Sequence, residues 1–252
     1  MKIFYFTATG NSLAVAKEIG GELISIAQVL KSGEKEFNDE AIGFVFPCYA
    51  FSMPYPVKKL LETVSFKADY FFAVITYGNI LGGTIKAFKK AAAKQNINLS
   101  YAASILMTDN YLPFYEMKKQ QQILAEKKVE DNLKRIASEI ESRKNAIESN
   151  NFFANFASSI FTTFNLMKPG KFDKAFYVQD SCNQCKVCQK VCPMNNIEIN
   201  EKPEFKQNCV SCLACTHNCP ENAIRMKSEK SKERYRNSSI QLADIISANN
   251  QL

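Results

Sequence analysis

The chain has 252 residues, of which 46% are hydrophobic, and a formal net charge of +7 at pH 7. This length and apolar content exclude a disordered tail and allow one large domain plus a smaller one. The start after Met1 lacks the small-residue cleavage site of a signal peptide, so we expect a core strand and a cytoplasmic protein. The longest charge-free run, residues 149–167, is too short and too polar for a transmembrane segment.

The sequence opens with an apolar run, the polar loop TATGNS and a helical pattern. Hydroxyl groups, a glycine and free backbone amides at a helix N-terminus favour a bound phosphate. The loop lacks the lysine of a nucleotide-triphosphate P-loop and the three-glycine dinucleotide fingerprint. We therefore expect it to bind a monophosphate.

Further apolar runs follow, separated by helical segments that include PVKKLLETV and GTIKAFKKAAAKQ; the runs are residues 22–26, 41–47, 70–78 and 100–107. This alternation predicts a parallel sheet covered by helices on both faces. Ligands of such sheets bind beyond the carboxyl ends of the strands, where TATGNS, PCYAFSMP and TYGNILGG all fall.

These three loops make residues 1–150 resemble flavodoxin, which implies an α/β fold with a doubly wound parallel sheet and bound FMN. The resemblance implies phosphate contacts from Thr7, Thr9, Gly10, Asn11 and Ser12. It places Pro47, Tyr49 and Ala50 on one side of the flavin ring, and Thr76, Tyr77, Gly78 and Asn79 on the other.

The two ring loops differ from those of small flavodoxins. The first has no Trp, and the second lacks the acidic residue common there, so which aromatic side chain stacks on the ring is open. Ordinary packing at a domain edge is the alternative role for Tyr49 and Tyr77. Cys48 is either a half-buried structural thiol, the default for a lone cysteine, or a redox group beside the flavin.

Two segments then lead out of this domain. Apolar residues at helical spacing between residues 116 and 147 predict a long surface helix, the last of the flavodoxin-like layer. Residues 151–175 are expected to form a connecting helix and linker, in which Phe152, Phe156, Ile160 and Phe164 make one apolar stripe. This stripe fits an interdomain helix, a lid over a hydrophobic substrate, or a membrane-surface anchor, although an anchor would normally carry Lys and Arg.

Eight of the nine cysteines form two runs, CNQCKVCQKVCP and CVSCLACTHNCP. Thiolates select zinc, copper(I) or iron–sulfur clusters. The spacing is that of bacterial ferredoxins, in which the fourth cysteine of each run binds the other cluster. We therefore predict two [4Fe–4S] clusters, one held by Cys182, Cys185, Cys188 and Cys219, the other by Cys209, Cys212, Cys215 and Cys192. Structural zinc is the alternative.

The runs make residues 176–228 resemble a two-cluster bacterial ferredoxin domain, which implies a small α+β unit of two hairpins and two ligand loops. His217, the one histidine, would be a surplus ligand, so we expect it to be exposed. Residues 229–252 form a basic tail with a short terminal helix. The tail either steers an acidic redox partner or stays solvated, and nothing in it indicates nucleic-acid binding.

The whole chain is similar to flavodoxin–ferredoxin fusions, which implies an electron-transfer protein that joins one-electron clusters to FMN and a redox partner protein. The alternative is an FMN-dependent reductase of a quinone or nitro compound, fed by the clusters. One histidine leaves little room for His-based proton chemistry, and no catalytic residue is named.

Overall fold

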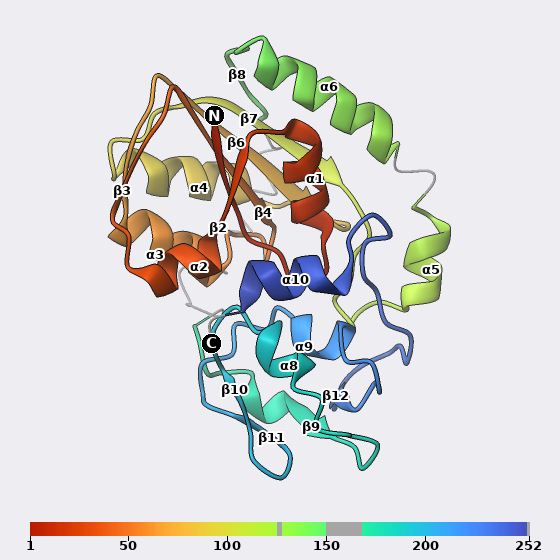
Figure 1. The fold of residues 1–252 in the computed structure, drawn as a ribbon. Coiled ribbons are helices and arrows are strands. Elements are labelled where there is room, and N and C mark those ends of the chain that lie inside the picture. The colour runs from red at the N-terminus through yellow and green to blue at the C-terminus, as the bar shows by residue number, and fades with distance from the viewer. Residues whose placement is uncertain (125–127, 150–167, 251–252) are drawn as a thin grey trace.

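The computed structural model describes residues 1–124, 128–149 and 168–250 (Figure 1). Strands of the amino-terminal part are β1 (Lys2–Tyr5), β2 (Glu22–Ser25), β3 (Glu36–Asn38), β4 (Ala41–Pro47), β5 (Ser65–Lys67), β6 (Tyr70–Tyr77), β7 (Leu99–Leu106) and β8 (Ala146–Ile147). Its helices are α1 (Asn11–Ile19), α2 (Ile26–Ser32), α3 (Tyr55–Thr63), α4 (Thr84–Ala93), α5 (Met117–Gln122) and α6 (Val129–Glu141).

Six of these strands form one parallel sheet in the order β2-β1-β4-β6-β7-β8. The first five of them follow the flavodoxin order, in which the chain reverses its direction of winding between β1 and β4. The predicted flavodoxin-like α/β fold is therefore confirmed. The reversal opens a place for ligands at the carboxyl edge of the sheet, beyond β1 and β4.

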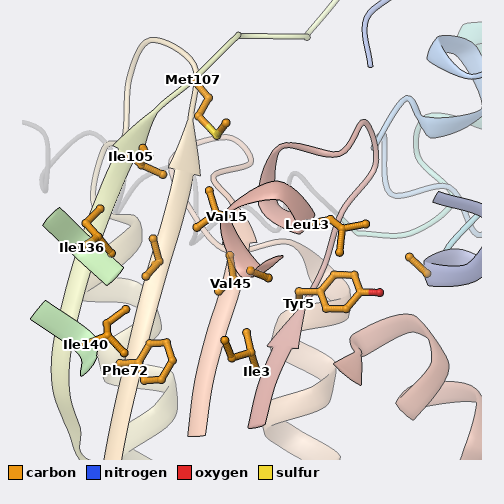
Figure 2. Close-up of a cluster of buried hydrophobic side chains, with 14 of the residues drawn as sticks. Ile3, Tyr5, Leu13, Val15, Val45, Phe72, Ile105, Met107, Ile136 and Ile140 are labelled. Carbon is orange, nitrogen blue, oxygen red and sulfur yellow. The ribbon is translucent and has the colours of Figure 1, made fainter. Parts of the chain in front are cut away.

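Buried side chains alternate along the central strands and build two cores. In β4, Phe44 and Phe46 face α3 and α4, whereas Val45 faces α1. In β6, Phe72 packs on the α1 side, close to Ile140 of α6 (Figure 2). Since both faces are covered, each strand reads as a continuous apolar run, as the sequence predicted.

The region expected to be one long surface helix differs from that prediction. It contains α5, α6 and the short strand β8, and only α6 packs on the sheet. Met117 of α5 and the preceding Leu112 are buried in the core of the cysteine-rich half. Apolar residues at helical spacing run through both segments, so the sequence predicted one helix where two amphipathic segments face different cores. The Phe-rich stripe lies outside the described residues.

The carboxyl-terminal half consists of short elements. They are β9 (Phe176–Val178), α8 (Val187–Lys190), β10 (Ile197–Ile199), β11 (Pro203–Phe205), α9 (Ala214–His217), β12 (Ile224–Met226) and α10 (Leu242–Asn249), with a 3₁₀ turn at Asp173–Ala175. Two antiparallel pairs, β10–β11 and β9–β12, flank the cysteine loops. No helix among the described residues is both long and apolar enough to cross a membrane.

The basic tail folds onto the rest of the protein. Figure 1 shows α10 between the sheet and the cysteine-rich half, where it contacts both α2 and α8. Ile240, Ile245 and Ala248 are buried in the same core as Ile3 and Val15. The tail therefore joins the two halves, a role that its charge did not suggest.

A substitution at Gly43 in β4 tests the packing of the sheet. An added Cβ would overlap the ring of Phe72 on the neighbouring strand. We expect Gly43→Ala to lower the free energy of unfolding by about 1–3 kcal/mol, the usual cost of overpacking. In a Phe72→Leu background the cost should be smaller, and urea unfolding of the four proteins measures the difference. Equal costs in both backgrounds would contradict this packing.

Candidate functional site

The cysteines line two neighbouring hollows. The outer hollow is lined by four cysteines together with exposed loop residues such as Asn183 and Lys186; the cysteines are Cys182, Cys185, Cys188 and Cys219. Three of them come from the first run and one from the second. The structure thus brings together the four residues that the crossed spacing rule assigns to one cluster.

The inner hollow lies within the cysteine-rich half, on the side that faces the sheet. Its four cysteines are Cys192, Cys209, Cys212 and Cys215, and most of its other lining residues are apolar. Cys212 also packs against the buried residues on both faces of the sheet. The inner hollow therefore lies at the carboxyl edge of the sheet, and Cys188 and Cys215 of the contacting helices α8 and α9 link it to the outer one.

The two cysteine loops share one local conformation. Gln184 and Lys186 in the first loop, and Ser211 and Leu213 in the second, all have φ near +60°. Side chains other than glycine rarely adopt this left-handed conformation, and it persists where the surrounding structure requires it. Hydrogen bonds repeat as well, because Asn196 N–H donates to Cys192 Sγ and Ala223 N–H to Cys219 Sγ, both at 3.3 Å.

The donor set of both hollows fits iron–sulfur clusters. Each hollow offers four thiols and no histidine, the ligand set of a [4Fe–4S] cluster. Among the described residues, no group of three or more His, Cys, Asp or Glu side chains has a geometry that could hold a single metal ion. Burial raises the pKa of Cys188 and of Cys209 to about 12, so cluster assembly would release their protons.

The TATGNS loop lies between β1 and α1 at the same edge of the sheet. Its side chains have protein partners: Gly10 N–H donates to Thr7 Oγ1, Asn11 Nδ2 donates to the Thr108 carbonyl, and Ser12 Oγ lies 2.8 Å from Thr76 Oγ1. Thr9 Oγ1 accepts from Asn110 Nδ2 at 2.6 Å. The loop is buried and joined to the ends of β6 and β7.

Three successive carbonyl groups of this loop accept hydrogen bonds from asparagines of the carboxyl-terminal half. Asn249 Nδ2 donates to Thr7 O at 2.9 Å, Asn218 Nδ2 to Ala8 O at 3.1 Å, and the Asn237 backbone N–H to Thr9 O at 2.8 Å. Tyr235 OH donates to Asn11 Oδ1 at 2.7 Å. These bonds, here called the asparagine clamp, fix the cysteine-rich half on the loop.

The clamp occupies the carbonyl groups and leaves donors of the loop unused. Among the described residues, none accepts a hydrogen bond from the backbone N–H groups of Ala8, Thr9, Asn11 or Ser12. Unpaired amide donors at a helix N-terminus suit a phosphate, so this loop fits the phosphate of FMN.

The first predicted ring loop lies close to the inner hollow. Tyr49 is half-buried, and burial, together with the nearby Cys212 and Cys209 sulfurs, raises its pKa well above the usual value. Ala50 and Phe51 have φ of 46° and 63° in a tight turn closed by the Tyr49–Ser52 bridge. Two left-handed residues in succession, neither of them glycine, mark a constrained loop of the kind found at ligand sites.

The second ring loop is supported by the loop after β7. Asn79 Nδ2 donates to Asp109 Oδ2 at 2.9 Å, and an added Cβ at Gly78 would overlap Asp109. Asp109 thus supplies an acidic group that TYGNILGG itself lacks. Tyr77 and Pro47 end their strands at this edge, and Ala50 is exposed.

Cys48 ties the two ring loops together. Thr84 Oγ1 donates to its sulfur at 3.0 Å, and its thiol donates to the Leu81 carbonyl at 3.3 Å. Burial raises the pKa of Cys48 to about 11. A neutral thiol with these partners matches the structural role.

His217 is buried, and the expectation that it is exposed was wrong. Its Nε2 lies 2.8 Å from the Asn110 carbonyl, and its Nδ1 accepts from the Tyr235 N–H at 3.1 Å. Burial lowers its pKa to about 4, so it is neutral at pH 7. The sequence indicated that His217 is no ligand, but it gave no sign of the tail that covers it.

Comparisons with known proteins leave the family open. No protein-family model matches the chain, and no curated protein matches it in sequence. Among solved structures it is similar to the Trp repressor binding protein from Bacillus subtilis, at 11% identity and a TM-score of 0.30. That match covers 49% of this chain and 92% of the other.

A substitution at Asn249 tests the asparagine clamp. Its side chain is buried, so Asn249→Ala would leave the Thr7 carbonyl without a donor, and we expect a loss of about 1–3 kcal/mol in the free energy of unfolding. Ala favours a helix more than Asn, so helix propensity would not cause the loss. Asn132→Ala, the same change at a partly exposed position of α6, is the matched control in urea unfolding. If the two variants unfold alike, the clamp does not form in solution.

Proposed function

We propose that this protein transfers electrons as an iron–sulfur flavoprotein, with two [4Fe–4S] clusters and FMN, and exchanges them with a redox partner protein. The observation that supports this most strongly is the grouping of the eight cysteines into two four-thiol hollows, each with ligands from both runs. Tyr49 lies near Cys212 and Cys209 of the inner hollow, which links this hollow to the first flavin loop.

The residues of the chain would hold and orient these groups. A [4Fe–4S] cluster passes single electrons, whereas FMN accepts one or two, so together they interconvert one-electron and two-electron chemistry. The TATGNS loop would hold the FMN phosphate through backbone N–H groups of Ala8, Thr9, Asn11 and Ser12. Asn218 connects this loop to Cys219, the next residue along the chain, and so fixes the cysteine loops against the flavin site.

The charge of the chain supports a protein partner of opposite sign. A net charge of +7 favours encounter with an acidic redox protein, and it would act on the association rate more than on affinity. Transfer of electrons alone needs no general acid or base. The neutral, buried His217 is consistent with that requirement.

Metal analysis tests the cluster assignment. Protein prepared under anaerobic conditions should contain about eight iron and eight sulfide ions per chain, as two [4Fe–4S] clusters require. Zinc in place of iron, without acid-labile sulfide, would contradict the assignment.

The exchange of the fourth ligands is tested by comparing three variants. Cys192→Ala should lose the inner cluster, so the EPR spectrum of its remaining cluster should match that of Cys209→Ala and differ from that of Cys188→Ala. If Cys192→Ala instead resembles Cys188→Ala, each run binds its own cluster and the proposed ligand sets are wrong.

Riboflavin, which lacks the phosphate, tests the flavin site. Hydrogen bonds to a charged group contribute about 1.5–3 kcal/mol, so FMN should bind the flavin-free protein about 10- to 100-fold more tightly than riboflavin. Fluorescence titration measures both affinities. Equal affinities would show that the TATGNS loop does not bind phosphate, and no binding of either would remove the flavin from the proposal.

A further inference from the structure

We infer that the two clusters differ in reduction potential and that the outer cluster is the easier one to reduce, so that electrons pass from the inner to the outer hollow and leave there. This inference rests on the proposed function and gives it a direction. It derives from the exposure of the two hollows and from buried charges beside each of them.

The two hollows differ first in their contact with water. Cys185 and its neighbours Asn183, Gln184 and Lys186 are exposed at the rim of the outer hollow. The inner hollow is lined mainly by buried apolar residues such as Ile197, Val210 and Leu213. A reduced cluster carries more negative charge, which water stabilises and an apolar shell does not, so exposure favours reduction of the outer cluster.

A buried cationic group begins directly after Ile224, which lines the outer hollow. The Arg225 and Arg234 guanidinium groups both pair with Glu229, with Arg234 Nη2 3.2 Å from Glu229 Oε2. The three side chains are only 11%, 9% and 7% exposed. Two cations on one anion leave a net positive charge, and because it is buried, solvent screens it weakly.

The tail places Arg234 close to a cluster ligand. The Tyr235 N–H, next to Arg234, donates to His217 Nδ1, and Arg236 Nη1 donates to Asn218 Oδ1 at 3.4 Å. Residues 235–236 therefore lie beside residues 217–218, which directly precede Cys219. Arg234 therefore stabilises added negative charge at the outer hollow.

Other charges at the outer rim change this balance little. Lys186 and Glu221 line the hollow with opposite charges, and Lys202 pairs with the exposed Asp180 at 2.7 Å. These groups are in water, where salt screens them.

The inner hollow has a buried anion instead. The Asp173 side chain accepts hydrogen bonds from Asn196 Nδ2 at 2.8 Å and from the Cys209 N–H at 3.3 Å. A carboxylate at this position opposes the addition of an electron to the inner cluster.

One interaction acts in the opposite direction. Ser211 N–H donates to Cys209 Sγ at 3.3 Å, a bond that favours reduction of the inner cluster. In the first loop, the Cys185 N–H donates to Asn183 Oδ1. A single amide dipole is weaker than the combined effect of a buried cation, a buried anion and unequal exposure.

The transfer step is a simple exchange of one electron. With clusters held by the two sets of cysteines, the step would oxidise the inner cluster by one electron and reduce the outer cluster by one, with no bond made or broken and no proton moved. Reduced flavin would supply the electron, and a one-electron redox protein that docks at the rim around Cys185 would accept it.

Redox titration of the complete, anaerobic protein, followed by EPR, tests the inference. The clusters should reduce in two one-electron steps separated by at least 59 mV, a tenfold difference in equilibrium constant. In Cys188→Ala, which should keep only the inner cluster, the step at lower potential should remain.

Variants that change a single charge test whether Arg234 and Asp173 cause the difference in reduction potential. Arg234→Gln should move the upper step to lower potential and leave the lower step in place, whereas Arg234→Lys, which keeps the charge, should not. Lys232→Gln removes an exposed charge from the same segment and is the matched control. Asp173→Asn should move the lower step to higher potential.

The outcomes separate this inference from the proposed function. Absence of iron and sulfide would refute the proposed function itself. Two clusters that titrate together, an upper step that survives in Cys188→Ala, or equal effects of Arg234→Gln and Lys232→Gln would overturn the inference alone.

Discussion

The exchange of one cysteine between the two runs is the constraint on which the rest of the carboxyl-terminal half depends. Cys219 reaches the outer hollow from the second run and Cys192 reaches the inner hollow from the first, so neither loop can be arranged without the other. The short helices α8 and α9 must then lie in contact, and the pairs β9–β12 and β10–β11 enclose them. Metal ligation by the eight cysteines would add to the folding free energy of this unit of short elements.

The second constraint is the carboxyl edge of the sheet. Parallel strands that end together leave polar backbone groups there, and the TATGNS loop presents both carbonyl and amide groups at this edge. The asparagine clamp pairs three carbonyl groups with the cysteine-rich half, whereas no described residue accepts a hydrogen bond from the amide groups of Ala8, Thr9, Asn11 and Ser12. One loop can thus serve both as a domain contact and as a phosphate site, which explains why a cluster and a flavin would share this edge.

The sequence was a good guide wherever a pattern was local. Continuous apolar runs predicted β4 and β6 almost to the residue, because strands buried on both faces need apolar side chains at every position. Cysteine spacing predicted which thiols meet. Long-range packing could not be predicted in this way: Asn218, Asn237 and Asn249 are ordinary polar residues until the fold brings them to the loop. The burial of Arg234 and His217 likewise depends on a tail whose charge suggested solvent.

Anomalous X-ray scattering at the iron edge, from crystals of the protein grown under anaerobic conditions, tests the central claim most directly. Iron is expected in two places: among Cys182, Cys185, Cys188 and Cys219, and among Cys192, Cys209, Cys212 and Cys215 beside Tyr49 at the edge of the sheet. Metal bound by each run through its own four cysteines, or a cysteine-rich half away from the TATGNS loop, would contradict it.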